Sequence, residues 1–298
     1  MHSPRRRRPE FDAARVYEYP QHLRASLDDL PAAPGVYIFH GETKDLPLYI
    51  GKSVHIRNRV LSHLRNEEEA RMLRQTRRIS HIRTAGEIGA LLLEASLIKQ
   101  QQPIFNQKLR RSRQLFSWTL KNAQESNGAD STNITKPELV YSRDVNFATH
   151  PGLYGLYTSR HAALEALRNL ADQHKLCYGA LGLEKLIPNK PCFRSMLQHC
   201  AGVCCGRETP QDHQARLLSS LAAMEVSCWP YPGAIGLVER FNDEYQMHII
   251  QHWCYLGSVG DPKQAKTLAS QAAGFDADGY KILCKPILSG TAEIVPLW

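Results

Sequence analysis

The sequence predicts an α+β protein: a small antiparallel sheet flanked by helices at the N-terminal end, then a cysteine-rich metal-binding segment, then an α+β C-terminal region. Three observations support this. Strand-like and helical patterns alternate in the first third of the chain, all eight cysteines lie at or after Cys177, and short apolar runs return after residue 228. Because 298 residues exceed one average domain, more than one compact unit is expected.

A β-hairpin is predicted near the N-terminal end. Residues 36–40 (VYIFH) and 48–51 (LYIG) are rich in strand-forming side chains, and the segment between them contains Gly41 and Pro47.

Helices and one further strand follow the hairpin. Ser53 stands where a helix N-cap is expected, with apolar residues at helical spacing after it. The patterns then predict a charged helical stretch over 67–78, an alternating strand over 79–84 and a long helix over 87–102 that ends at Pro103.

The rest of the chain is less regular. Residues 121–137 are polar and indicate a mobile loop or linker. Helices are predicted around 162–174, 211–225 and 263–273, and strands at 235–238, 248–256 and 280–288. Asp276 and Asp278 lack the pattern of a calcium loop and indicate a turn.

Positive charge is concentrated in the first part of the chain. Up to Arg113 there are 21 Lys+Arg and 12 Asp+Glu, a net charge of +9, whereas from Gln114 there are 16 and 17, a net charge of −1. Such an excess favours a polyanionic partner, because phosphate neutralisation releases counterions. A solvated basic surface is an equally good interpretation of charge alone.

The compartment is predicted to be the cytoplasm, with no membrane partner. The basic start, Met1 to Arg8, runs directly into Pro9 and Glu10 with no apolar stretch behind it, and no run of about 18 apolar residues exists. Disulfides are therefore not expected.

Two tyrosines of the hairpin are candidate site residues. Tyr37 and Tyr49 could be brought onto one face of the sheet, although strands are rich in tyrosine and a structural role is the more common one. Arg59 and His63 are four residues apart and so share a helix face, close to Lys52. This group of cations beside phenols suits a phosphodiester, and a solvent-facing basic helix is the alternative.

Glu94 is a carboxylate on an otherwise apolar helix face. Its neighbours three and four residues away are all apolar: Ala90, Leu91, Leu97 and Ile98. Burying a carboxylate is costly unless a cation compensates it, so Glu94 predicts either an ion pair or a divalent metal.

Four cysteines form a candidate metal centre. They are Cys177, Cys192, Cys200 and Cys204, which lie within 28 residues. Thiols at these intervals can surround tetrahedral zinc or an iron–sulfur cluster, and buried free thiols are the alternative.

Several of these motifs together resemble one family. GVY, a short gap, YIGK, the arginine eight residues after the YIG glycine, LLLEASLIK and PIFN, within residues 31–110, resemble the GIY-YIG nuclease module of the UvrC type. The resemblance implies the following boundaries: an extension at 1–30, the nuclease domain at 31–113, a connecting strand and linker at 114–137, a cysteine-rich helical region at 138–227 and an α+β region at 228–298.

The resemblance also implies roles for the site residues. Tyr49 acts as, or positions, the general base for an attacking water, while Tyr37 and Lys52 support that water and the phosphate. Arg59 stabilises phosphoryl charge, and Glu94 is the single protein ligand of Mg²⁺ or Mn²⁺. Asn106 braces the site.

Two chemical points accompany these roles. A tyrosine base needs a nearby cation such as Lys52 to lower its pKa. The family often has tyrosine where this chain has His63, whose imidazole could hydrogen-bond to phosphate or relay a proton.

The cysteine segment is similar to that of UvrC-type proteins. The resemblance implies a [4Fe–4S] cluster on the four cysteines, with zinc as the alternative. Cys205 directly follows the last of them, so another choice of ligand remains open.

The order of these segments resembles the front half of UvrC, without its RNase H-like nuclease and helix-hairpin-helix pair, as in short homologues of that protein. This implies incision on the 3′ side of a bulky lesion in double-stranded DNA already marked by UvrB. The alternatives are a stand-alone structure-specific nuclease and a non-catalytic DNA-binding adaptor. For the last region, partner or DNA docking is the hypothesis.

Overall fold

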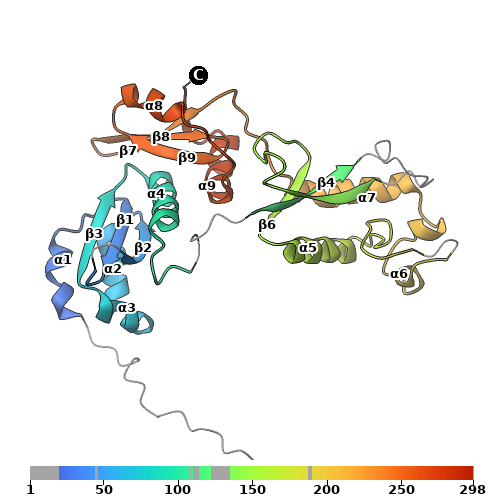
Figure 1. Cartoon of the computed structure of the whole chain (residues 1–298), viewed down its shortest axis with the longest axis horizontal. Coiled ribbons are helices and arrows are strands. Elements are labelled where there is room, and N and C mark those ends of the chain that lie inside the picture. The colour runs from blue at the N-terminus through green and yellow to red at the C-terminus, as the bar shows by residue number, and fades with distance from the viewer. Residues whose placement is uncertain are drawn as a thin grey trace, which may run out of the picture. The chain divides into compact units, whose positions relative to one another are not determined.

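The computed structural model describes residues 20–43, 46–107, 109, 114–121, 135–186 and 190–297. The protein divides into two compact units (Figure 1). The first unit combines Met1–Ser112 with Tyr231–Trp298, and the second unit is Arg113–Pro230. Two segments that are distant in the sequence therefore fold together in the first unit.

The N-terminal sheet of the first unit has three antiparallel strands in the order β2-β1-β3. They are β1 (Gly35–His40), β2 (Pro47–Ser53) and β3 (Arg78–Arg83). The first five residues of β1 are buried, because it is the central strand and helices cover both of its faces. The predicted hairpin and the predicted strand after it are confirmed.

The two faces of β1 pack against different helices, since alternate side chains of a strand point to opposite sides. Tyr37 and Phe39 belong to a core shared with one group of helices, whereas Val36 and Ile38 pack with Ile98 on the other face. The first group is α1 (Ala25–Asp28), α2 (Ile56–Leu64) and α3 (Ala70–Gln75), with the short 3₁₀ turns η1 (Gln21–Leu23) and η2 (Glu67–Glu69); the other face is covered by α4 (Glu87–Gln101).

The start of α2 differs from the prediction. Ser53 is the last residue of β2, and the N-cap is His55, whose Nδ1 accepts a hydrogen bond from the backbone N–H of Asn58 at 3.3 Å. The hydroxyl of Ser53 instead accepts from the backbone N–H of His55 at 2.9 Å. Ser53 therefore orders the turn before the helix, and not the helix itself.

The C-terminal sheet belongs to the same unit and has the antiparallel order β10-β7-β8-β9. Its strands are β7 (Ile235–Phe241), β8 (Glu244–Gln251), β9 (Cys254–Val259) and β10 (Glu293–Pro296). The single strand predicted over 248–256 is wrong. His252 and Trp253 have φ of 53° and 65°, and this left-handed pair makes the two-residue turn between β8 and β9.

Two helices accompany this sheet: α8 (Ala265–Ala269), which follows η6 (Pro262–Gln264), and α9 (Ala277–Leu288). The strand predicted over 280–288 is wrong, since these residues lie in α9. The side chain of Asp276 accepts hydrogen bonds from the first amides of α9, and Leu283 and Ile287, four residues apart, are buried. Asp276 and Asp278 are thus helix-start residues and do not form a free turn.

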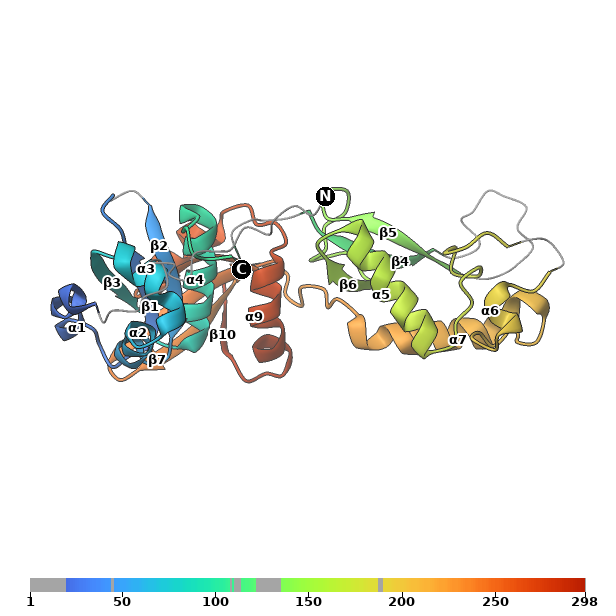
Figure 2. The same ribbon diagram turned by 90° about the horizontal axis from the view of Figure 1, so that it is seen from below.

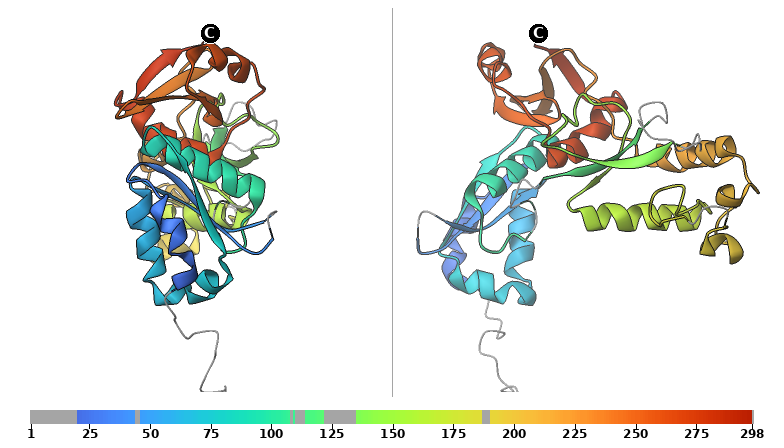
Figure 3. Two further views of the ribbon diagram at one scale, coloured as in Figure 1. Left: turned by 90° about the vertical axis from the view of Figure 1, so that its left-hand side faces the viewer. Right: turned by 45° about the vertical axis from the view of Figure 1, so that its right-hand side comes forward.

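α4 lies between the N-terminal sheet and the C-terminal part of the first unit (Figures 1 and 3). One side packs on β1 and β2, and the other packs on α9 and β9. Lys99 of α4 forms ion pairs with Asp276 at 2.6 Å and Asp278 at 2.9 Å. The predicted helix over 87–102 is confirmed, with Gln102 as its C-cap.

The second unit contains the sheet β5-β4-β6, also antiparallel, with helices packed against it (Figure 2). Its elements are β4 (Phe116–Lys121), β5 (Lys136–Tyr141), β6 (Leu153–Tyr157), α5 (Arg160–Gln173), α6 (Phe193–Met196), η4 (Val203–Cys205), α7 (Pro210–Leu221) and η5 (Ala222–Met224). The two helices predicted here are confirmed as α5 and α7. Most of the predicted linker, residues 122–134, lies outside the described residues. The predicted α+β class is confirmed for both units.

Candidate nuclease site and metal centre

Tyr37 and Tyr49 lie on one face of the N-terminal sheet, as predicted. The register pairs Tyr37 with Gly51 and Phe39 with Tyr49, so the two tyrosines are diagonal neighbours, and their ring centroids are 6.3 Å apart. Gly51 allows this arrangement: a Cβ at that position would lie 2.3 Å from the hydroxyl of Tyr37. The glycine therefore leaves room for the Tyr37 phenol over β2.

His63 connects Tyr37 to an acidic side chain. Its Nε2 is 2.7 Å from the hydroxyl of Tyr37, and its Nδ1 hydrogen-bonds the carboxylate of Glu69. A carboxylate only accepts, so Nδ1 carries the proton and Nε2 of a neutral imidazole accepts from Tyr37. The imidazole is only 4 % exposed. The solvent-facing alternative for this residue is therefore wrong.

Arg59 lies one helical turn before His63 and is exposed. Its guanidinium interacts with the hydroxyl of Tyr37, and this interaction is the main reason that the pKa of Arg59 is raised. The guanidinium of Arg59 is thus next to the tyrosine pair and is also accessible to solvent. An anion that approaches the phenols meets a permanent positive charge.

The pKa values of both phenols are raised. Burial raises the pKa of Tyr37 far above its usual range, and the neighbouring Tyr49 adds to this while Arg59 opposes it. Burial also raises the pKa of Tyr49, with the charges of Glu94 and Glu69 adding to the effect. Burial, more than any charge of the protein, therefore keeps both tyrosines protonated.

Lys52 does not supply the expected charge to Tyr49. Its ammonium forms an ion pair with Glu87 at 2.6 Å, at the exposed start of α4. Its backbone is closer to the site, because the N–H of Lys52 donates to Oε1 of Glu94 at 2.9 Å.

Glu94 is half-buried beside the edge strand β2. Burial raises its pKa, and the hydrogen bond from Lys52 together with the charges of Lys52 and Arg59 counters part of that rise. A carboxylate held by one backbone amide and disfavoured as a bare anion suits a divalent cation. Mg²⁺ fits such a site, because it retains most of its waters and needs one or two carboxylates.

Asn106 fixes the same edge of β2. Its Oδ1 accepts from the N–H of Ile50 at 2.9 Å and its Nδ2 donates to the carbonyl of Ile50 at 2.8 Å. One amide side chain thereby supplies the donor and the acceptor that a neighbouring strand would otherwise provide to Ile50.

Two acidic residues of this site were missed by the sequence analysis. Glu69 belongs to the acidic run 67–69 directly after a basic helix, which is the only signal that could have indicated it. Glu87 starts α4, where an acidic residue is a common helix-terminal feature.

The four predicted cysteines converge in the second unit. The sulfur atoms of Cys177, Cys192, Cys200 and Cys204 all lie within 4.8 Å of one another. Burial raises the pKa of the Cys177 thiol far above its usual range, and raises that of Cys200 to about 11. Grouped, buried thiols of this kind favour a metal that binds the thiolates.

The sulfur separations bear on the type of metal. They are 3.8 Å between Cys177 and Cys192 and 3.6 Å between Cys192 and Cys200. Zinc–sulfur bonds of about 2.3 Å in a tetrahedron give sulfur–sulfur distances of about 3.8 Å. A cubane cluster is larger than one ion and requires the thiols to move apart. Cys205 is exposed and contacts Ser195 and the carbonyl of Gly202 instead.

Three family models match successive parts of the chain. They are the UvrC-like GIY-YIG domain at residues 33–107, the UvrC/Cho excinuclease middle domain at 130–223 and the Excinuclease Cho C-terminal domain at 234–298.

Relatives match almost the whole length. Excinuclease cho of Escherichia coli (strain K12) is 56% identical over 290 residues, which are 97% of this chain and 94% of that protein. The Salmonella typhimurium excinuclease cho is 57% identical, with 97% and 95% covered. This chain belongs to the excinuclease Cho family. The UvrABC system protein C of Cyanothece sp. is 34% identical over 202 residues, 64% of this chain and 30% of that protein.

Solved structures include the GIY-YIG N-terminal endonuclease domain of UvrC from Thermotoga maritima, bound to its catalytic divalent cation, magnesium. It is 35% identical, covers 28% of this chain and 93% of that chain, and has a TM-score of 0.26.

Membership of the excinuclease Cho family confirms the predicted resemblance and makes the chain a metal-dependent endonuclease with a GIY-YIG nuclease domain. Among the described residues, no helix combines the length and the apolar character needed to cross a bilayer.

Proposed function

We propose that this protein is a nucleotide-excision-repair endonuclease that incises damaged double-stranded DNA on the 3′ side of a bulky lesion, after UvrB has marked the site. The observation that carries the proposal is the meeting of the Tyr37–Tyr49 pair, Arg59 and Glu94 around β2, since this group can hold a phosphodiester, a water and one divalent cation.

The proton route starts at Tyr49, which orients the attacking water. Tyr49 lies beside Tyr37 and interacts with its hydroxyl, and the hydroxyl of Tyr37 is 2.7 Å from Nε2 of His63. As the water attacks phosphorus, its proton passes to Tyr49, the proton of Tyr49 passes to Tyr37, and that of Tyr37 passes to His63. Glu69 then stabilises the imidazolium. The relay avoids a free phenolate, which the raised pKa values of both tyrosines make costly.

Arg59 neutralises charge on the phosphoryl oxygens, and Glu94 binds Mg²⁺ or Mn²⁺. When bound, the ion stabilises the leaving oxygen and, by its charge, lowers the pKa of Tyr49. Asn106 keeps Ile50 and the adjoining Tyr49 in place, and the ammonium of Lys52 contacts phosphate when it leaves Glu87.

The test is an end-labelled lesion duplex incubated with UvrB, Mg²⁺ and this protein. We expect one cut, on the 3′ side of the lesion, that requires both UvrB and the metal. Cutting of the same duplex without UvrB favours a stand-alone nuclease.

The matched control is Glu94→Ala, for which we expect DNA binding within about twofold of the unaltered protein and no incision. Metal-dependent incision by purified Glu94→Ala protein contradicts the role of Glu94. No incision by the unaltered protein under any of these conditions favours the adaptor alternative.

We also propose that Cys177, Cys192, Cys200 and Cys204 ligate a structural metal centre. The family resemblance favours a [4Fe–4S] cluster, and the sulfur separations favour zinc. Iron and zinc analysis of anaerobically purified protein, with its absorbance near 400 nm, distinguishes the two: a colourless protein with one zinc and no iron contradicts the cluster.

A further inference from the structure

The first turn of α4 has no capping side chain of its own. Its N-cap is Gly86, which has no side chain, yet the first four amides of any helix lack a partner within the helix. This matters because α4 carries Glu94 in its middle.

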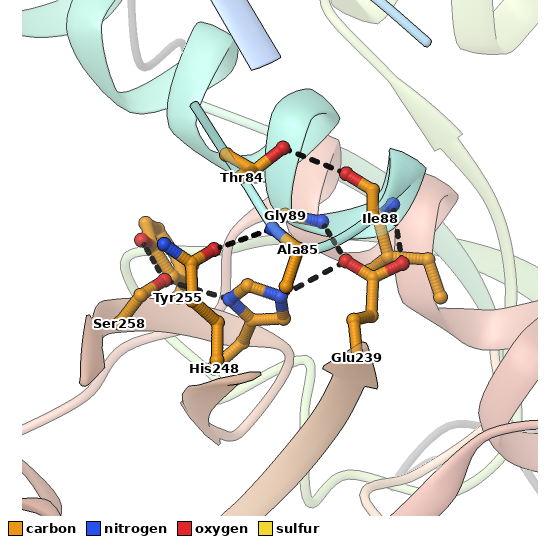
Figure 4. Close-up of polar contacts among 10 residues, drawn as sticks. Thr84, Ala85, Ile88, Gly89, Glu239, His248, Tyr255 and Ser258 are labelled. Carbon is orange, nitrogen blue, oxygen red and sulfur yellow. Dashed lines mark hydrogen bonds and ion pairs between the residues drawn. The ribbon is translucent and has the colours of Figure 1, made fainter. Parts of the chain in front are cut away.

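Glu239 of β7 supplies the missing cap from the C-terminal sheet. Its Oε1 accepts from the N–H of Ile88 at 3.0 Å and its Oε2 accepts from the N–H of Gly89 at 2.7 Å (Figure 4). A carboxylate at this place also interacts favourably with the helix dipole. The two partners are 151 and 150 residues away in the sequence.

Neighbouring strands hold the Glu239 carboxylate in place. Nε2 of His248 on β8 is 3.0 Å from Oε2, Nδ1 of the same ring is 2.7 Å from the hydroxyl of Ser258 on β9, and that hydroxyl is 2.6 Å from the hydroxyl of Tyr255 (Figure 4). His248 is fully buried. The carboxylate is therefore oriented by three connected side chains.

Two glycines of the TAGEIG segment leave the space that this contact needs. A Cβ on Gly86 would lie 2.2 Å from the carboxyl carbon of Glu239, and a Cβ on Gly89 would lie 2.4 Å from Cε1 of His248. Gly89 lies in the first turn of α4, and this close approach explains why that position has no side chain.

A second contact holds the other half of α4. Lys99 pairs with Asp276 and Asp278, which start α9. Glu94 lies five residues after Gly89 and five before Lys99, so contacts from the C-terminal region flank it on both sides. These contacts at both ends of α4 restrict its translation and its rotation. They come from the C-terminal region, whereas the proposed nuclease residues all lie in the N-terminal part of the chain.

We propose that Glu239 is a positioning residue of the nuclease: by capping α4 from the C-terminal sheet, it sets the position of the Glu94 carboxylate for the divalent cation. This rests on the proposed metal role of Glu94. On this proposal the C-terminal region of the chain has a second role besides docking, because it positions a metal ligand of the nuclease site.

The experiment measures Mn²⁺ binding to the full-length protein without DNA, by the EPR signal of free Mn²⁺. We expect Glu239→Ala to raise the dissociation constant of the Mn²⁺ that Glu94 binds by about 10-fold, the size typical for residues that support a metal ligand. The isosteric Glu239→Gln keeps one acceptor oxygen and should give an intermediate value, which also serves if Glu239→Ala does not fold.

In incision assays the same variants should need a higher Mg²⁺ concentration for half-maximal rate, with the KM for DNA unchanged. The matched control is Glu244→Gln. Glu244 also joins the C-terminal sheet to the N-terminal sheet, but it does so through an ion pair at 3.0 Å with Arg83, which lies in β3 and not in α4. It should bind Mn²⁺ like the unaltered protein.

Two results overturn the inference. If Glu94→Ala removes the Mn²⁺ site while Glu239→Ala and Glu239→Gln leave the dissociation constant within twofold, Glu239 only stabilises the fold. If Glu94→Ala binds Mn²⁺ unchanged, the metal role of Glu94 fails, and the inference fails with it.

Discussion

The hydroxyl of Tyr37 lies 2.7 Å from Nε2 of His63, whose other ring nitrogen hydrogen-bonds Glu69. In such an arrangement the carboxylate, here Glu69, fixes the tautomer of the imidazole, and the other ring nitrogen of the imidazole can accept a proton. His63, which departs from the usual tyrosine of the family, is thus buried at the end of the proposed proton path, which begins at Tyr49.

Removing the imidazole should slow chemistry and leave DNA binding intact. For His63→Phe we expect a loss of incision rate on the order of 100-fold, the lower range for a general acid–base group. Single-turnover incision with DNA binding measured in parallel checks this. Unchanged single-turnover rates contradict a proton-accepting role for His63.

The oriented tautomer should depend on Glu69. Glu69→Gln should reduce the incision rate by less than His63→Phe does, because an amide still hydrogen-bonds Nδ1 but stabilises an imidazolium poorly. The neighbouring Glu68, which is exposed and lies in the same acidic run, provides the matched control as Glu68→Gln. Equal rates for the two variants are inconsistent with the relay.

A methyl group on Gly51 should displace the Tyr37 hydroxyl. A Cβ there would lie 2.3 Å from that oxygen, so Gly51→Ala must move either the ring or β2. We expect an incision loss similar to that of Tyr37→Phe, and no further loss in the double variant Gly51→Ala/Tyr37→Phe. Additive losses in the double variant argue for separate effects.

Capping by Glu239 should also be visible in the dependence of stability on pH. Burial by itself raises the pKa of Glu239, but the hydrogen bonds from His248 and the α4 amides outweigh it, and the pKa is lowered from 4.5. A lowered native pKa means that the stabilisation is present above the unfolded-state value and is lost as pH falls through the native value.

At pH 7, Glu239→Ala should therefore lower the free energy of unfolding by about 1.5–3 kcal/mol, the range for hydrogen bonds to a charged group. The difference from the unaltered protein should shrink below pH 4.5. Urea unfolding at several pH values, monitored in the first unit, measures it. A difference that stays constant down to pH 3 argues against the charged carboxylate as the source.

The choice of cysteine ligands can be tested directly. Cys204→Ser should lose the bound metal, because its sulfur is one of the four that converge. Cys205→Ser should keep it, since Cys205 is exposed and bonds to Ser195 and Gly202. Metal content per chain is the measurement. Equal metal loss in both variants means that the two adjacent thiols exchange as ligands.

Local patterns were sufficient for the elements that carry the site. The strand-forming side chains of VYIFH and LYIG placed Tyr37 and Tyr49 on neighbouring strands, and the spacing around Glu94 placed a carboxylate on an apolar helix face. Both are short-range signals. The four cysteines were found because thiols are rare and their grouping is conspicuous.

Local patterns misled where an apolar run fits both a strand and a helix. Residues 280–288 contain enough apolar side chains for a buried strand, and Pro286 argues against a helix interior. The structure makes them α9, because Asp276 caps the first amides and Leu283 and Ile287 bury the same face. Periodicity alone cannot separate a short buried strand from a short buried helix.

From the amino-acid order alone, the reactive groups and their strands and helices could be predicted, since each follows from neighbours within a few residues. The thiol cluster could be predicted from the grouping of four cysteines within 28 residues. Three contacts were decided only by the tertiary structure. Glu69 hydrogen-bonds His63, Glu87 forms an ion pair with Lys52, and Glu239 caps α4. These contacts join residues on different elements, up to 151 positions apart. A local sequence pattern cannot predict them, because it contains no information about which distant carboxylate lies near a given backbone amide. The packing of the chain determines these contacts. The backbone N–H groups at a buried helix start need hydrogen-bond acceptors, and the fold decides which distant side chain can supply them.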